Sequence, residues 1–110
     1  MINLVSQKLG EIGLPVLWQI RPESFPSLTF SFLSEYGEIF ADDKEIETAY
    51  LLQVDIWSKD DYSAIAILVK TKLSELGFHR TAEYDDYENN TKIYHKILRF
   101  SYLKETESEV

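Results

Sequence analysis

The stretch Ile46–Leu76, IETAYLLQVDIWSKDDYSAIAILVKTKLSEL, contains a strand pattern that passes directly into a helix pattern. Its first part alternates apolar and polar residues, and a period of two is typical of a strand with one covered face. Its second part repeats apolar residues at helical spacing, which predicts an amphipathic helix packed on that covered face. The apolar strand face is Tyr50, Leu52, Val54 and Ile56, opposite Gln53, Asp55 and Trp57, and the helix stripe is Tyr62, Ile65, Ala66, Val69, Leu73 and Leu76.

Both ends of this helix carry recognisable signals. Ser58 followed by Asp61 predicts a capping box, and Asp60 and Asp61 place negative charge at the positive end of the helix. Gly77 predicts a left-handed C-terminal cap. The strand and helix are therefore expected to be separate elements joined by a short connection.

The rest of the chain adds one more helix and four more strands. Gly13 and Pro15 end a first amphipathic helix, and prolines, glycines or polar runs bound each strand. We expect a helix over about Ile2–Ile12, strands over Pro15–Ile20, Leu28–Tyr36, Phe78–Glu88 and Thr91–Lys104, a loop over Arg21–Ser27, a turn from Gly37 through the polar run Ala41–Glu45, and a hairpin turn over Glu88–Asn90.

This order, α-β-β-β-α-β-β, favours antiparallel hairpins over repeated βαβ units. The sequence therefore predicts an α+β fold: an antiparallel sheet of about five strands with two helices packed on one face. Residues 1–104 are expected to form a single domain and residues 105–110 an acidic flexible tail. The predicted core is Phe30, Val54, Ile56, Ile65, Val69, Leu73, Leu98 and Phe100.

Composition argues against several classes of function. Eleven Lys and Arg against nineteen Asp and Glu give a formal charge of −8, which opposes specific binding to nucleic acid or anionic lipid. There is no cysteine, so disulfides and thiolate metal sites are excluded. The longest uninterrupted apolar run, Ala64–Val69, is far shorter than the roughly 18 residues of a membrane span. We expect no membrane contact.

No residue pattern indicates catalysis, a cofactor or a metal. His79 and His95 have no second ligand at a helical or hairpin spacing, and the acidic pairs Asp42–Asp43 and Asp85–Asp86 are interpreted as solvated charge. Phosphate-binding glycine loops and nucleophile motifs are missing from the sequence. We therefore predict that the protein is not an enzyme.

Aromatic residues make up 14% of the chain, and four tyrosines, Tyr84, Tyr87, Tyr94 and Tyr102, fall in the last hairpin. Tyrosines on a strand with polar neighbours are common at protein–protein contacts, because they bury area at low entropic cost. The alternative is that they cover the rim of the core. The face with His95, Arg99 and Ser101 is expected to meet solvent or a partner.

Five segments together resemble a family of small phage proteins. They are GEIFADDKEIE from Gly37, QVDIWSKDDY from Gln53, GFHR from Gly77, YDDYE from Tyr84 and KIYHKILRF from Lys92. This pattern is similar to the tail-completion proteins of phages and prophages of Gram-positive bacteria, which include tail terminators and tail-to-head joining proteins. The resemblance covers nearly the whole chain and implies a small α+β domain without a catalytic motif.

The resemblance implies a structural virion protein at the head–tail junction. Such a protein assembles in the host cytoplasm into a ring, usually a hexamer, that caps the tail tube and joins it to a head-completion or connector protein. The DNA would pass through the ring, and an acidic lumen would leave it mobile, although net charge also serves solubility. We expect the subunit interface at Asp42, Asp43, Lys44, Glu45, Tyr84, Tyr87 and Tyr94. The alternative is a small non-catalytic adaptor or regulatory protein that binds a phage or host protein as a monomer or dimer.

Overall fold

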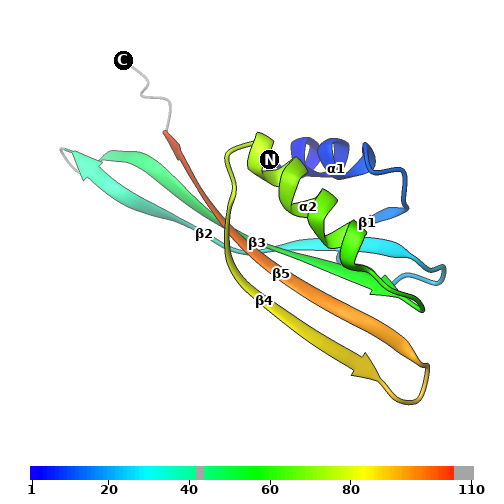
Figure 1. The fold of residues 1–110 in the computed structure, drawn as a ribbon. Coiled ribbons are helices and arrows are strands. Elements are labelled where there is room, and N and C mark those ends of the chain that lie inside the picture. Colours follow the sequence, from blue (N-terminus) through cyan, green and yellow to red (C-terminus); the bar gives the residue numbers. More distant parts are fainter. Residues whose placement is uncertain (42–43, 106–110) are drawn as a thin grey trace.

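The computed structural model describes residues 1–41 and 44–105. Within them the predicted order of helices and strands is confirmed (Figure 1). The elements are α1 (Ile2–Gly10), β1 (Val16–Trp18), β2 (Ser27–Ala41), β3 (Lys44–Ser58), α2 (Ser63–Glu75), β4 (His79–Glu88) and β5 (Ile93–Glu105).

The five strands form one sheet in the order β1-β2-β3-β5-β4. Three of the four pairings are antiparallel, as expected, but β1 lies parallel to β2, with Val16 opposite Leu28 and Trp18 opposite Phe30. The prediction of a wholly antiparallel sheet was therefore wrong. Because β1 has only three residues, the connection over residues 19–26 is long enough to return the chain to the starting end of β1.

Both helices lie on one face of the sheet, where they cover its apolar side chains (Figure 1). The predicted strand face and helix stripe are confirmed, since Val54, Val69 and Leu98 are inaccessible to solvent. Ile65 differs from the prediction, because it is only partly buried at the edge of the core. The buried core is Val5, Leu9, Leu28, Phe30, Leu52, Val54, Ile56, Ala66, Val69, Leu73, Phe78, Leu98 and Phe100.

The two ends of α2 compare differently with the prediction. The Ser58–Asp61 capping box does not form, because Ser58 still pairs with Tyr94 in the β3–β5 ladder and its hydroxyl bonds to the backbone of Asp60. The helix instead begins at Ser63, whose backbone N–H donates to Asp61 Oδ1 over 2.9 Å.

The predicted left-handed cap at Gly77 is confirmed, with φ of +98°. The N–H of Gly77 donates to Ser74 O and that of Phe78 to Leu73 O, which completes a Schellman end. A Cβ at Gly77 would also lie 2.8 Å from the ring of Tyr102, so glycine is required there by both conformation and space.

The β2–β3 hairpin is longer than the sequence indicated. Gly37 was expected to begin a turn, but it lies inside β2 beside a register shift, and pairing continues to Ala41 opposite Lys44. A glycine can mark a bulge as readily as a turn, which explains the error. We call residues 34–41 and 44–51 the arm. It extends past the helices, and the molecule measures 53 × 25 × 21 Å (Figure 1).

Other boundaries also moved, and the strand expected over Pro15–Ile20 is limited to Val16–Trp18. The first helix ends at Gly10 and not at Ile12. Glu105 belongs to β5, opposite Glu47, while the remainder of the predicted acidic tail, residues 106–110, lies outside the described residues.

Candidate interaction surfaces

The predicted interface segment in the β2–β3 connection has a different geometry from the one expected. Lys44 and Glu45 are the first residues of β3, and Ile39, Phe40 and Ala41 belong to β2, so most of this segment is hairpin and not loop. Asp42 and Asp43 lie outside the described residues. The arm nevertheless carries this segment away from the helices, to one end of the long axis of the molecule (Figure 1).

The three predicted interface tyrosines of the last hairpin do not form one cluster. Tyr87 and Tyr94 face each other across β4 and β5 on the helix side, with ring centroids 4.8 Å apart. Tyr84 lies on the opposite face, beneath the guanidinium of Arg99 at 5.5 Å. All three are 41–50% exposed, which is compatible with contact to a partner from two different directions.

The fourth tyrosine, Tyr102, is only partly exposed and packs on the hydrophobic core. Its ring lies 5.1 Å from Phe78 and 6.4 Å from Tyr50, and Tyr50 contacts Phe32 at 6.0 Å. These rings form an aromatic row across the sheet where the arm joins the helix-covered part. Tyr102 therefore covers the rim of the core, which was the alternative to a role in a protein–protein contact.

A hydrogen-bonded network centred on Asp55 lies on the sheet face that carries no helix. Asp55 is only 8% exposed, and His95 Nε2 lies 2.8 Å from its Oδ1. Because a carboxylate only accepts, the imidazole donates this bond. Gln53 Nε2 donates to both carboxylate oxygens over 3.1 and 3.3 Å, and Thr29 Oγ1 lies 3.5 Å from Oδ2. One acid thus joins three strands.

Trp57 extends this network into an aromatic stack. Its indole N–H donates to Thr29 Oγ1 over 2.9 Å, and its ring lies parallel to that of His95 at 3.8 Å. Arg21 covers Trp57, with its guanidinium carbon 4.9 Å from the ring centroid. We call Arg21, Trp57, His95 and Asp55 the open-face cluster. Trp and Arg held rigidly in this way are typical of residues that dominate binding energy at interfaces.

Arg21 is also tied to the hairpin end by two hydrogen bonds to the Glu88 carboxylate, of 2.9 and 2.5 Å. The bond from Arg21, with a second from Thr91, lowers the pKa of Glu88 to about 2. Sequence alone gave no indication of this role, because Arg21 lies in a loop 67 positions from Glu88. The alternation of the strands did indicate that Asp55 shares a face with Trp57.

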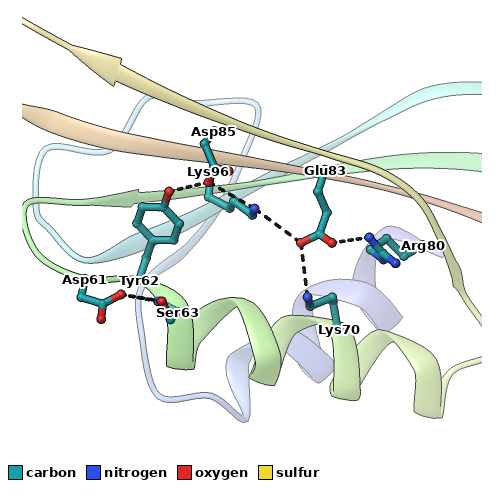
Figure 2. Close-up of polar contacts among 8 residues, drawn as sticks. All are labelled: Asp61, Tyr62, Ser63, Lys70, Arg80, Glu83, Asp85 and Lys96. Atoms are coloured by element: carbon teal, nitrogen blue, oxygen red, sulfur yellow. Dashed lines mark hydrogen bonds and ion pairs between the residues drawn. The ribbon is translucent and has the colours of Figure 1, made fainter.

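A second polar surface lies between α2 and β4, as Figure 2 shows. The hydroxyl of Tyr62 donates to Asp85, a contact that raises the pKa of Tyr62 to about 12 and lowers that of Asp85. Glu83 lies 3.2 Å from Lys70 Nζ and 3.5 Å from Lys96 Nζ. Burial alone would raise the pKa of Glu83, but these lysines together lower it.

This surface encloses a wide groove of about 840 Å³. Three lysines and four carboxylates line it, so its charges largely neutralise one another and favour neither an anion nor a cation. At the N-terminal end of α2, Asp61 accepts hydrogen bonds from the backbone N–H and the hydroxyl of Ser63, over 2.9 and 2.6 Å. A carboxylate of the chain itself therefore already lies at this end of the helix.

Nowhere in residues 1–41 and 44–105 do three His, Asp or Glu side chains converge as a metal site would require. None of the described helices is long and apolar enough to cross a membrane. Asp85, which belongs to an acidic pair interpreted from the sequence as solvated charge, accepts a hydrogen bond from Tyr62 and pairs with Lys96 at 3.1 Å.

Comparison with protein-family models finds no match to this sequence, and neither does comparison with curated proteins. The surfaces themselves, with the sequence pattern of the five segments named above, are therefore what points to a function.

Proposed function

We propose that this protein is a structural subunit of a phage tail-completion ring at the head–tail junction. In this role copies of the chain assemble, as a hexamer, on the end of the tail tube and join it to a head-completion or connector protein. The chain contributes surfaces and no catalytic reaction. The resemblance of the five sequence segments supports this role, and so does the shape of the fold.

The observation that carries the proposal is the arm. A ring requires a heterologous contact, in which one surface of a subunit meets a different surface of the next. An arm that leaves the helix-covered part of the sheet along a 53 Å axis can reach a neighbour while that part keeps its own core. The exposed Tyr84 and the open-face cluster supply aromatic and arginine side chains of the kind that such contacts use.

The net charge is consistent with a ring through which DNA passes. A formal charge of −8 per chain opposes retention of the phosphate backbone. The expected result is no gel shift with double-stranded DNA at low ionic strength. A salt-dependent gel shift would contradict the role of a passive conduit.

Native mass spectrometry across a concentration series, alone and with purified tail tubes, tests the proposal. We expect a ring, either in solution or only on the tubes, whereas a monomer or dimer that ignores the tubes would support the alternative of an adaptor. The matched variants reverse two acids each. Asp42→Lys with Asp43→Lys should reduce assembly on tubes, while Glu23→Lys with Asp60→Lys, away from the arm, should not. If the Asp42→Lys, Asp43→Lys variant assembles normally on the tubes, Asp42 and Asp43 are not part of the interface.

A further inference from the structure

The outer edge of β2 is left open where β1 ends. β1 pairs only with Leu28–Phe30, and the last bond of this pairing runs from the N–H of Gln19 to Phe30 O over 3.1 Å. Gln19 has a φ of +58°, which turns the chain off the edge. In the part of the chain that the structure describes, β2 continues from Ser31 to Ala41 with a neighbour only on its β3 side. Such an edge presents backbone donors and acceptors to any strand that approaches.

An apolar pocket lies beside the beginning of this open edge. It has a volume of about 440 Å³ and lies between the start of α1 and the sheet. Trp18 and Ile2, two of its walls, are 45% and 40% exposed. Paired residues in a sheet point to the same face, so the residue of an added strand opposite Phe32 would point toward this pocket. The lining residues are Met1, Ile2, Asn3, Trp18, Gln19, Phe32 and Tyr50.

We propose that this edge, from Ser31 to Gly37, together with the pocket beside Phe32, binds an extended basic segment of another protein by β-strand addition. Main-chain hydrogen bonds to β2 would supply affinity, and an apolar side chain in the pocket would set the register. The inference holds whether or not the protein acts in a phage tail.

Charge and geometry together select this occupant. In sequence, the open part of β2, residues 31–41, contains two acidic residues, Glu35 and Glu38, and no lysine or arginine. A second copy would bring the same acids to the edge, whereas lysines or arginines between the apolar residues would be attracted to it. The bulge at Leu33, where the β2–β3 register shifts, bends the edge and suits a short segment better than a second flat sheet.

The test uses the intact protein and a heptapeptide that alternates lysine with isoleucine. Amide chemical shifts should change along Ser31–Gly37, and the Trp18 side chain should respond while Trp57, on the other face, should not. A peptide of the same composition with its three isoleucines adjacent is the control for charge alone. Equal binding of that control, shifts spread over other acidic surfaces, or no binding of the alternating peptide would overturn the inference.

Two proline variants form a matched pair. Leu28 and Phe30 direct their backbone groups to the β1 side, and after the register shift at Leu33 this alternation directs the N–H of Glu35 to the open edge. Glu35→Pro and Thr81→Pro each place a residue without an N–H on an edge strand, β2 and β4 respectively, where proline is best tolerated. Glu35→Pro should weaken binding about tenfold, the effect of roughly one or two main-chain hydrogen bonds, and Thr81→Pro should not. Equal weakening by both would refute the site. If Glu35→Pro fails to fold, Trp18→Ala tests the pocket, and unchanged affinity would then refute the site.

Discussion

Removing the carboxylate of Asp55 should destabilise the protein by about 2–3 kcal/mol. This side chain is 8% exposed and accepts hydrogen bonds from His95 and Gln53, with Thr29 at 3.5 Å. Asp55→Ala leaves these donors without their acceptor, and a buried unsatisfied group costs about 1–3 kcal/mol. Water can reach part of the site, since the His95 side chain is 16% exposed, so the costs of several donors do not add fully. Asp55→Asn retains an acceptor and should cost about 1 kcal/mol.

Urea unfolding, followed by circular dichroism, measures both variants. A double-mutant cycle with His95→Ala isolates the Asp55–His95 term, which we expect at about 1–2 kcal/mol. Asp86→Ala is the control, because Asp86 is the exposed register partner of His95 on β4 and should change stability by less than about 0.5 kcal/mol. A loss below about 0.5 kcal/mol for Asp55→Ala, or no coupling to His95, would refute the reasoning that the network holds three strands together.

Three further predictions follow from individual contacts. Val69→Ala should lower the free energy of unfolding in urea by about 2–3 kcal/mol, because two buried methyl groups are lost and a cavity remains. Leu68→Ala, on the exposed side of α2, should lower it far less. Equal losses would show that the buried face of α2 is wrongly assigned. The hydrogen bond to Asp85 raises the pKa of Tyr62 to about 12, so its contribution to the free energy of unfolding is present below pH 10 and is lost as the pH rises toward 12. Ultraviolet titration should show one tyrosine that ionises later than the others and that Tyr62→Phe removes. A titration that Tyr62→Phe leaves unchanged would contradict this. The hydrogen bond from Arg21 lowers the pKa of Glu88 to about 2, so its contribution to the free energy of unfolding is present above pH 4.5, the ordinary pKa, and is lost as the pH falls toward 2. In Arg21→Gln, the pKa of Glu88 measured by NMR should return toward 4.5. A pKa that stays near 2 would mean that other groups cause the shift.

The faces of the elements were predictable from the sequence because periodicity is a local property. Val54 and Val69 repeat with their own strand and helix, and both are inaccessible in the core. Long-range pairing was not predictable in this way. Ser58 was assigned to a helix cap because its local pattern fits one, but its pairing with Tyr94 retains it in the sheet. The parallel placement of β1 likewise depends on a partner strand, and Gly37 gave the same local signal for a bulge as for a turn.

In the candidate surfaces, too, the sequence predicted which face a residue lies on but not which distant residues it contacts. Tyr84 and Tyr87 are three positions apart on one strand, so alternation alone places them on opposite faces, and the expectation of one interface that includes both overlooked this. Asp55 and His95 were each placed on the polar face of their strand, but only the β3–β5 register brings them together. Arg21 came from a loop, and no spacing rule indicated that it would cover Trp57.

The shortness of β1 has a consequence for how the native protein opens. Three residues hold this strand to β2, and the preceding helix is tied to α2 by surface ion pairs such as Lys8 with Glu75 at 2.6 Å, besides the buried Val5 and Leu9. The segment from residue 1 to Trp18 is therefore the natural unit of sub-global unfolding, with the amides of β1 exchanging with solvent before those of β3. Each such opening would extend the open edge of β2 back to Leu28. Transient local unfolding of the N-terminal segment would therefore control how many backbone hydrogen-bonding groups the sheet exposes to other chains.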